Sequence, residues 1–214
     1  MSGFRRGLMA NAAIEDYFKL VVQVTAEQAQ PLLYDFSVAF AHGITGFIDI
    51  DWGDGNKETR TGLDNKINII HYYSKPGIYT LKLRGEQIQR FGFGWDTVDG
   101  MVIDCNSNWS AVGGKVTVMD GSFFSETLFT GASFKSLPPN VQRTDDLFRG
   151  CSQCVINLDT LVANAPAEGW TELTNITRMF FSCGKVTGSR SAFLAKCPNV
   201  TNTEKWADGT ATTE

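Results

Sequence analysis

Residues 47–55 read F-I-D-I-D-W-G-D-G, and residues 71–83 read H-Y-Y-S-K-P-G-I-Y-T-L-K-L. In the first segment, Ile48, Ile50 and Trp52 alternate with aspartates, so a strand here has one apolar face and one charged face. The glycines and aspartate that follow accept the positive φ angles that a tight hairpin needs. In the second segment, a Pro-Gly pair opens another alternating run. The two segments therefore predict strands that are joined by tight turns.

The motif W-G-D-G, followed by H-x-Y-x-x-P-G-x-Y-T-L-x-L, resembles the signature of PKD-type immunoglobulin-like domains. The resemblance implies a β-sandwich and says almost nothing about function. The residues that carry it are Trp52, Gly53, Asp54, Gly55, His71, Tyr73, Pro76, Gly77 and Tyr79.

Further alternating runs flank these segments. Strands are expected at 18–24, 34–41, 57–61, 67–71 and 78–84, each separated from the next by turn residues. Together with the strand before Trp52, this makes six short strands, a pattern typical of a sandwich. We therefore predict an N-terminal arm over residues 1–14, a sandwich over residues 15–85, and a second domain over residues 86–214.

The second domain contains an internal repeat. Residues 140–151 can be laid over residues 199–210 at an offset of 59, and residues 146–151 over residues 178–183 at an offset of 32. A weaker copy lies at residues 128–132. The expected unit is a short helix that ends in a small residue, followed by a turn and a short strand such as 134–137 or 155–158. Such a unit cannot bury its apolar face alone, so neighbouring copies are expected to stack.

The M-F-x-x-C segments, preceded by N-[VI]-T, resemble leucine-rich repeats of bacterial surface proteins and of structural proteins of phages that infect gut bacteria. The resemblance covers about residues 120–214. The expected fold class is thus mainly β: a PKD-type immunoglobulin-like sandwich plus a small irregular leucine-rich-repeat ladder with short helices. The expected repeat core consists of Leu147, Phe148, Cys151, Met179, Phe180, Cys183 and Cys197.

Composition limits the classes of partner. The formal net charge of −4 and the absence of a basic patch argue against nucleic acid and anionic membranes as partners. No run of about 20 apolar residues is available to insert into a membrane. The first residues lack the apolar segment of a signal peptide, and the five cysteines do not suggest a secreted disulfide framework. We expect a protein that is made in the cytosol of the host and leaves it, if at all, in an assembled particle.

Two metal sites can be considered. Asp49, Asp51 and Asp54 could supply oxygen ligands to Ca²⁺, but the loop pattern of a dedicated calcium site is missing. A zinc site would draw on four thiols, but only one C-x₂-C pair is present, and small buried residues are expected at these repeat positions. We therefore predict no metal and no cofactor, although Ca²⁺ near the three aspartates stays open. The four thiols are those of Cys151, Cys154, Cys183 and Cys197.

Catalysis is not expected. A nucleophilic triad needs a histidine base, and the chain has only His42 and His71, the second of which occupies a position of the PKD signature. Paired carboxylates for glycoside hydrolysis could be drawn from Asp49, Asp51, Asp145 and Asp146, but acids in turns are common on any surface. Sequons at Asn108, Asn175 and Asn199 more readily supply hydrogen bonds at turns than glycosylation sites.

Both resemblances therefore imply a binding function. The first hypothesis is a virion component, such as a capsid decoration or fibre-type protein, that binds other virion proteins and forms a homo-oligomer. The alternative is an adhesin-like protein of the bacterial surface that binds host ligands. The candidate partner-binding residues lie in the arm and in the last repeat copy: Phe4, Arg5, Arg6, Leu8, Met9 and Trp206.

Overall fold

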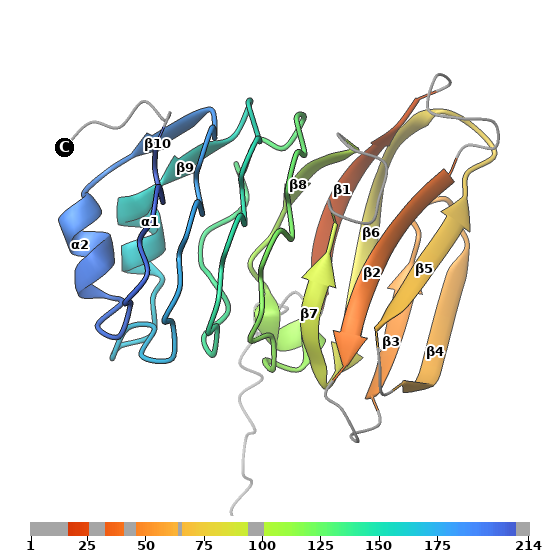
Figure 1. Ribbon diagram of the computed structural model, residues 1–214. Coiled ribbons are helices and arrows are strands. Elements are labelled where there is room, and N and C mark those ends of the chain that lie inside the picture. Colours follow the sequence, from red (N-terminus) through yellow and green to blue (C-terminus); the bar gives the residue numbers. More distant parts are fainter. Residues whose placement is uncertain (1–16, 26–32, 41–45, 64–65, 94–100, 209–214) are drawn as a thin grey trace, which may run out of the picture.

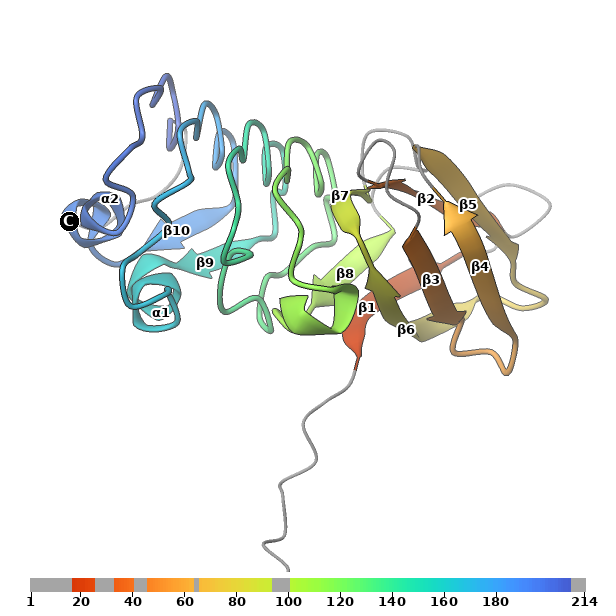
Figure 2. The same ribbon diagram turned by 90° about the horizontal axis from the view of Figure 1, so that it is seen from below.

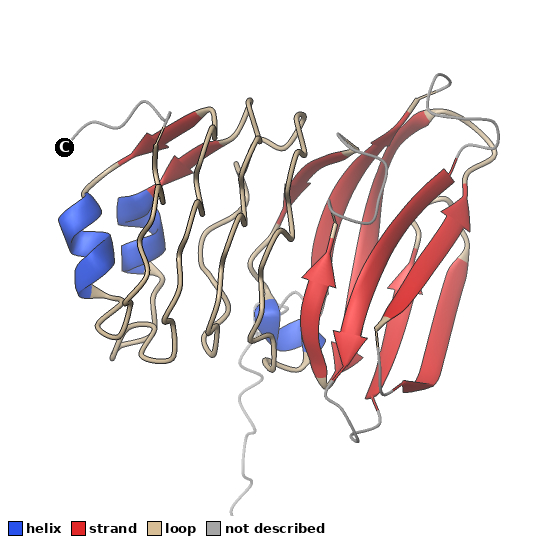
Figure 3. Ribbon diagram, viewed as in Figure 1, coloured by secondary structure: helices blue, strands red, loops and turns tan. Residues whose placement is uncertain are grey.

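Strands dominate the secondary structure. The computed structural model describes residues 17–25, 33–40, 46–63, 66–93 and 101–208. Two antiparallel sheets pack face to face at one end of the molecule, and a stack of turns with short parallel pairings extends from them (Figures 1 and 3). The protein is thus mainly β, as the sequence predicts. In the described part of the chain, no helix has the length and apolar character that crossing a membrane requires.

The larger sheet has five antiparallel strands in the order β4-β3-β6-β1-β8. The smaller sheet has three antiparallel strands in the order β5-β2-β7. The five-stranded sheet contains β1 (Phe18–Val24), β3 (Gly46–Asp51), β4 (Lys57–Leu63), β6 (Gly77–Glu86) and β8 (Val102–Cys105). The three-stranded sheet contains β2 (Leu33–Phe40), β5 (Ile67–Tyr72) and β7 (Ile88–Gly92).

The alternating sequence pattern explains how these strands face the core. In β1, every second residue from Phe18 to Val24 is buried, and the residues between are partly exposed. In β3, Ile48 and Ile50 are buried, while Asp49 and Asp51, which alternate with them, are partly exposed. The six strands predicted from this pattern are confirmed, with ends that shift by a few residues.

β7 and β8 belong to the two sheets, although they lie beyond the predicted domain boundary at residue 85. β7 pairs with β2, and β8 pairs with β1, although both strands follow residue 85 in the sequence. The sheets are therefore completed by residues that the sequence analysis places in the second domain. Whether the chain divides into two domains near residue 85 stays a prediction.

A series of parallel bridges continues from β7. Single-residue bridges connect Arg90, Val118, Arg143, Asn175 and Asn202 in that order. We call this series and the turns attached to it the ladder, and each of its segments a rung. Figures 1 and 2 show the rungs side by side, with the first one against β7. Neighbouring rungs are also connected by backbone hydrogen bonds within the turns, such as Phe148 N–H to the carbonyl of Met179 at 2.8 Å.

Two longer elements flank the later rungs. β9 (Val155–Asn157) and β10 (Lys185–Thr187) form a two-stranded parallel sheet. Each is followed by a six-residue helix, α1 (Leu158–Ala163) after β9 and α2 (Arg190–Ala195) after β10. The predicted strand at 155–158 is confirmed for its first three residues.

The predicted helices in the repeat are wrong. Residues 145–150 and 177–182 form turns, and the helices follow the short strands instead. Each turn contains two residues with positive φ, namely Asp146 (56°) and Gly150 (79°) in one and Arg178 (50°) and Ser182 (55°) in the other. An α-helix of L-residues cannot contain such residues without strain, so the chain curls at each of them. The strand predicted at 134–137 is also absent.

One cluster of buried side chains runs from the sheets into the ladder. The rings of Phe91, Phe93, Phe123, Phe148 and Phe180 stack in that order, with neighbouring centroids 5.1 to 5.7 Å apart. Phe91 lies in β7, and the last three rings belong to successive rungs. Offset stacking of this kind stabilises aromatic pairs beyond the area that they bury. The sheets and the ladder therefore share one apolar interior.

The segment between β8 and the ladder packs into this interior. The 3₁₀ helix η1 (Trp109–Val112) places the Trp109 ring 5.0 Å from Phe18 of β1. The indole N–H of Trp109 donates to the carbonyl of Ser136, at 2.9 Å. This buried tryptophan thus links the five-stranded sheet to the first rungs.

Candidate functional site

The residues of the two PKD-like motifs form one aromatic cluster. The Trp52 ring stacks on His71 with centroids 4.5 Å apart, and His71 meets the Tyr73 ring edge-on at 4.7 Å. Tyr73 in turn stacks on Tyr79 at 4.0 Å, and its hydroxyl donates to the carbonyl of Trp52 at 3.0 Å. Burial raises the pKa of Tyr73 well above its ordinary value, so the hydroxyl remains a donor. The cluster packs the hairpin between β3 and β4 against β5 of the three-stranded sheet.

His71 and Asp54 are hydrogen-bonded to each other within this cluster. His71 Nε2 donates to Asp54 Oδ2 at 2.8 Å, and the other carboxylate oxygen accepts the backbone N–H of Asn56 at 3.0 Å. Burial alone would raise the pKa of Asp54, but the hydrogen bonds from His71 and Asn56 outweigh it, and the pKa is lowered. Both side chains are only 13 to 14% exposed. The imidazole therefore acts as a structural donor that connects β5 to the hairpin turn.

The glycines of the motifs allow backbone conformations that other residues rarely adopt. Gly53 has a φ of 80°, and a Cβ at this position would lie 2.7 Å from the carbonyl oxygen of Thr80. Gly55 has a φ of 98° but faces open space. Pro76 and Gly77 lead directly into β6, as expected for a turn before a strand. These positions therefore determine the path of the chain and present no reactive group.

The five cysteines are free and buried. The thiol of Cys151 donates to the carbonyl of Phe123 at 2.8 Å, and the thiol of Cys183 faces the carbonyl of Cys154 at 3.9 Å. Burial raises the pKa of Cys151 well above its ordinary value and that of Cys197 to about 12. Zinc binds the thiolate, whereas burial keeps the thiols of Cys151 and Cys197 protonated. In the described part of the chain, no group of three or more His, Cys, Asp or Glu residues is arranged to hold a metal ion.

Four other residues that the sequence analysis assigns to the repeat core are buried. Leu147, Phe148, Met179 and Phe180 are fully buried in the turns of two adjacent rungs. Their side chains and the cysteine thiols fill the interior of the ladder. Core packing, the preferred interpretation of these positions, agrees with this placement.

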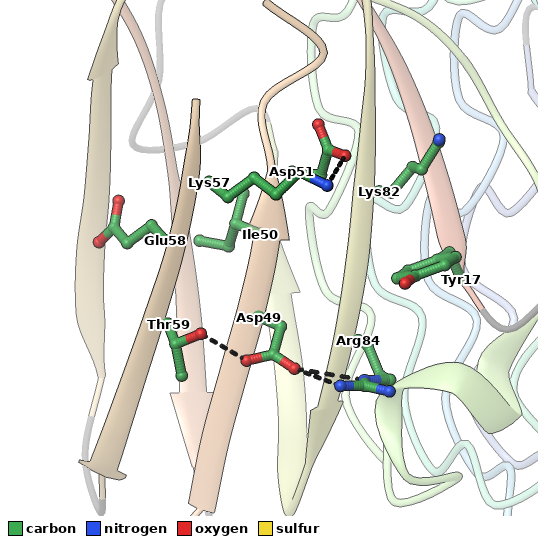
Figure 4. A pocket seen from close by; sticks show the side chains of 9 residues that line it. All are labelled: Tyr17, Asp49, Ile50, Asp51, Lys57, Glu58, Thr59, Lys82 and Arg84. Atoms are coloured by element: carbon green, nitrogen blue, oxygen red, sulfur yellow. Dashed lines mark hydrogen bonds and ion pairs between the residues drawn. The ribbon is translucent and has the colours of Figure 1, made fainter. Parts of the chain in front are cut away.

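A charged hollow of about 210 Å³ lies on the outer face of the five-stranded sheet (Figure 4). Asp49 accepts hydrogen bonds from Arg84 at 2.7 Å and from Thr59 at 2.8 Å, and the bond from Arg84 is the main reason that the pKa of Asp49 is lowered. Asp51 pairs with Lys57 at 3.2 Å. Both aspartates are thus neutralised by side chains of the neighbouring strands, and Asp54 lies apart in the hairpin turn. The three carboxylates therefore do not point to one common position where they could bind a cation together.

A second and larger hollow, of about 530 Å³, lies on the ladder. We call it the ladder groove. Three aspartates and three arginines line it together with amide and hydroxyl side chains, and each rung from β7 to the last contributes to it. The lining residues are Arg90, Asp120, Arg143, Asp145, Asp146, Asn175, Thr177, Arg178 and Asn202.

The charged side chains of the groove are connected across the rungs. Arg143 bridges Asp120 and Asp145, at 2.9 and 2.8 Å. Arg178 binds Asp146 through two parallel hydrogen bonds of 2.8 Å each. Burial and the neighbouring Asp145 raise the pKa of Asp120 above its ordinary value. Salt bridges of this bidentate form fix the orientation of both partners.

The sequence analysis did not predict the ladder groove. Asp145 and Asp146 appear there only as rejected catalytic acids, and Asn175 only as a sequon. The side chain of Asn175 does hydrogen-bond the turn, because its Oδ1 accepts the backbone N–H of Thr177 at 3.0 Å. The repeat spacing relates some of these positions: the offset of 59 aligns Arg143 with Asn202, and the offset of 32, extended beyond the matched residues, places Asn175 at the same position.

Trp206 is less available to a partner than predicted. It is partly buried and stacks on Phe193 of α2 with centroids 5.7 Å apart, and the guanidinium of Arg190 lies over its ring at 5.8 Å. The other candidate partner-binding residues, Phe4, Arg5, Arg6, Leu8 and Met9, lie outside the described residues.

Comparison of the chain with protein-family models, with curated proteins and with solved structures found no match.

Proposed function

We propose that this chain is a non-catalytic structural and binding protein of a virion, either a capsid decoration or a fibre-type component. In this proposal, the two sheets form a PKD-type immunoglobulin-like sandwich, and the ladder is an irregular set of leucine-rich repeats. The observation that carries the proposal is the ladder groove, where β7 and the four rungs that follow it present polar side chains side by side on one surface.

The spacing of the rungs supports the repeat part of the proposal. The bridge residues Arg90, Val118, Arg143, Asn175 and Asn202 are separated by 28, 25, 32 and 27 residues. Leucine-rich repeats are typically about 20–29 residues long. The longest interval, between Arg143 and Asn175, contains β9 and α1.

The shared interior supports a display function. Each rung contributes buried side chains to one continuous core, so neighbouring rungs hold one another in register. Side chains at equivalent positions then form columns on the surface. Such a surface suits the recognition of an extended partner, because contacts repeat along its length.

The state of the reactive groups supports a function without catalysis. The imidazole of His71 is engaged in the hydrogen bond to Asp54 and stacks on the Trp52 ring. The thiol of Cys151 is buried and has a raised pKa. A general base or a nucleophile needs access to substrate and a pKa near the working pH.

Mass spectrometry of purified particles tests the proposed location. Particles released from the bacteria that carry the gene should contain this polypeptide in a constant ratio to the main capsid protein after density-gradient purification. A polypeptide that is absent from the particles, and that protease treatment removes from the surface of intact cells, would instead support the adhesin alternative. Light scattering of the purified protein gives its oligomeric state independently.

A further inference from the structure

The turns of the four rungs pair with one another in one direction. At each of the three junctions between these rungs, four backbone N–H groups of the earlier rung donate to four carbonyls of the later rung, at 2.7 to 3.1 Å. The donors are alternate residues of the turn, which in the last junction are Ile176, Arg178, Phe180 and Ser182. The side of a turn that faces the next rung therefore presents donors, and the opposite side presents acceptors.

The backbone conformation of the turns accounts for this direction. A residue with positive φ, between 48 and 60°, recurs at the same position of every rung: Gly121, Asp146, Arg178 and Lys205. N–H groups between the donors bond within their own turn, as from Trp206 to the carbonyl of Thr203 at 3.2 Å in the last rung. Because the last rung repeats both features, its remaining N–H groups point the same way as those of the earlier rungs.

The last rung has two such donors without an acceptor. Thr203 and Lys205 stand where Ile176 and Arg178 stand in the rung before. Neither backbone N–H has a hydrogen-bond acceptor among the described residues, and both residues are exposed. They lie at the end of the ladder farthest from the sheets (Figures 1 and 2).

One acceptor stands beside these donors. At the entry to each turn the direction of pairing is reversed, so that the N–H of Thr201 donates to the carbonyl of Thr174 at 3.0 Å. The carbonyl of Thr201 itself has no donor in the described part of the chain, and the residue is exposed. The edge of the last rung thus offers one carbonyl followed by two N–H groups at alternate residues.

A second copy of this chain does not supply the complementary edge. Two last rungs would meet with donors facing donors. The acceptor side of the first rung is already occupied, because the carbonyl of Ser122 accepts the N–H of Phe93 at 2.8 Å and that of Asp120 accepts Arg90 Nη2 at 3.0 Å. Copies of the chain therefore cannot continue the ladder end to end.

The charges of the last rung argue against a free anion. Residues 201–208 contain two acidic side chains, Glu204 and Asp208, and one basic side chain, Lys205, and all three are exposed. An anion bound to the N–H groups of Thr203 and Lys205 would lie close to carboxylates in the same turn. Neutral backbone carbonyls satisfy the same donors without bringing like charges together.

We propose that the last rung is a docking edge for a segment of another protein, which lies parallel to the rung and presents one N–H followed by carbonyls at alternate residues. This inference rests on the proposed binding function and specifies the kind of partner. Proteins bind extended segments in this way at open sheet edges, where main-chain hydrogen bonds supply affinity. Trp206, in the same turn and only partly buried, adds an aromatic contact.

A tethered copy of a rung tests this edge. Residues 174–187 include the third rung, which presents the required pattern of one N–H and alternate carbonyls to the second rung. Joined to the C-terminus of the full chain by a flexible Gly-Ser linker, this segment is held at a high effective concentration. In amide hydrogen exchange followed by NMR, the N–H groups of Thr203 and Lys205 should then exchange about tenfold or more slowly than in the wild type.

The matched control is the same chain with the tethered segment shuffled, in which Thr203 and Lys205 should exchange as in the wild type. An ester in place of the Lys205 amide, introduced by ligating a synthetic segment at Cys197, removes one donor and keeps the side chain. It should reduce the protection of Thr203 by the tethered rung. Exchange at Phe148, whose N–H bonds to Met179, shows that the ladder stays folded in every variant.

Three results would overturn the inference. The first is equal exchange at Thr203 and Lys205 with the tethered rung and with the shuffled one. The second is protection of these N–H groups in the wild type when its own concentration is raised, which would mean that a second copy pairs there. The third is protection of the wild type by phosphate or sulfate alone, which would make the edge an anion site.

None of these results bears on whether the polypeptide is part of a particle, which mass spectrometry decides separately. Conversely, docking at the last rung of a protein that is absent from particles would refute the proposed location alone.

Discussion

Gly53 occupies a position in the hairpin that only glycine fits. Its φ of 80° is rare for other residues, and a Cβ would lie 2.7 Å from the carbonyl oxygen of Thr80. Gly55 shares the positive φ but has nothing within 4 Å of the Cβ position. Alanine substitutions at the two positions therefore separate the free-energy cost of backbone strain from that of a steric clash.

We expect Gly55→Ala to lower the free energy of unfolding by about 1–2 kcal/mol, the cost of a positive φ for an L-residue. Gly53→Ala should cost clearly more, because the backbone of β6 must also move. Urea denaturation of both variants measures the difference. Equal losses of unfolding free energy in the two variants would show that the backbone at Thr80 can shift at no cost in free energy.

Asp54 should make stability depend on pH. Its folded pKa lies below the ordinary value of 3.8, so its contribution is fully present above pH 3.8 and is lost as the pH falls below that value. Asp54→Asn should lower the free energy of unfolding at pH 6 by about 1–3 kcal/mol, because His71 and Asn56 lose a charged acceptor.

Urea denaturation from pH 6 to pH 2.5 measures this effect, and the difference between wild type and Asp54→Asn should shrink below pH 3.8. The exposed Glu172 provides the control, since Glu172→Gln should stay within about 0.5 kcal/mol of the wild type at every pH. A difference that does not change with pH would mean that the pair with His71 contributes nothing.

Among the elements, α1 depends strongly on its N-cap. The helix has only six residues, and the Asn157 side chain accepts the backbone N–H of Thr160 at 3.0 Å. A helix this short is not stable alone and needs its cap and its buried leucines. Asn157→Ala should therefore lower the free energy of unfolding by about 1 kcal/mol.

Asn157→Asp keeps the acceptor and should be close to the wild type, which makes it the control for this cap. Both variants can be compared by chemical denaturation at neutral pH. A loss of equal size in the two variants would argue that the amide of Asn157, rather than its oxygen, matters.

The turns of the repeat show why element types were only partly predictable. The spacing of apolar residues in 145–150 and 177–182 suits a helical turn, but Asp146 and Arg178 adopt positive φ in the fold. Every second backbone N–H group of these turns bonds to the neighbouring rung, as from Phe148 to Met179, and others bond three residues back within their own turn. Pairing between rungs thus takes up half of the backbone N–H groups that a helix would have bonded within its own segment.

At the scale of the whole molecule, the shared core predicts one unfolding transition. Phe123 stacks on Phe93 and on Phe148, with centroids 5.3 and 5.6 Å apart, and so connects the side chains near β7 to the ladder. Calorimetry should show a single peak for the wild type. Phe123→Ala should destabilise the protein by about 3–5 kcal/mol and shift the whole peak to lower temperature.

Two peaks, of which Phe123→Ala moves only one, would show that the sheets and the ladder unfold separately. Such a result would favour the division of the chain near residue 85. Lys115→Ala, an exposed site in the first rung, should leave the peak nearly unchanged and serves as the control.

The sequence by itself determined the strands of the sheets and the interior positions of the repeat. Alternation at Ile48, Ile50 and Trp52, and recurrence at Cys151 and Cys183, are local patterns that burial imposes directly. The order of the strands, the use of β7 and β8 to complete both sheets, and the ladder groove were decided only by the tertiary structure. They depend on contacts between residues far apart in the chain. Arg143 and Arg178 meet their aspartates only after the rungs stack. The spacing of the repeat copies indicates which positions are equivalent, but not which charges will pair.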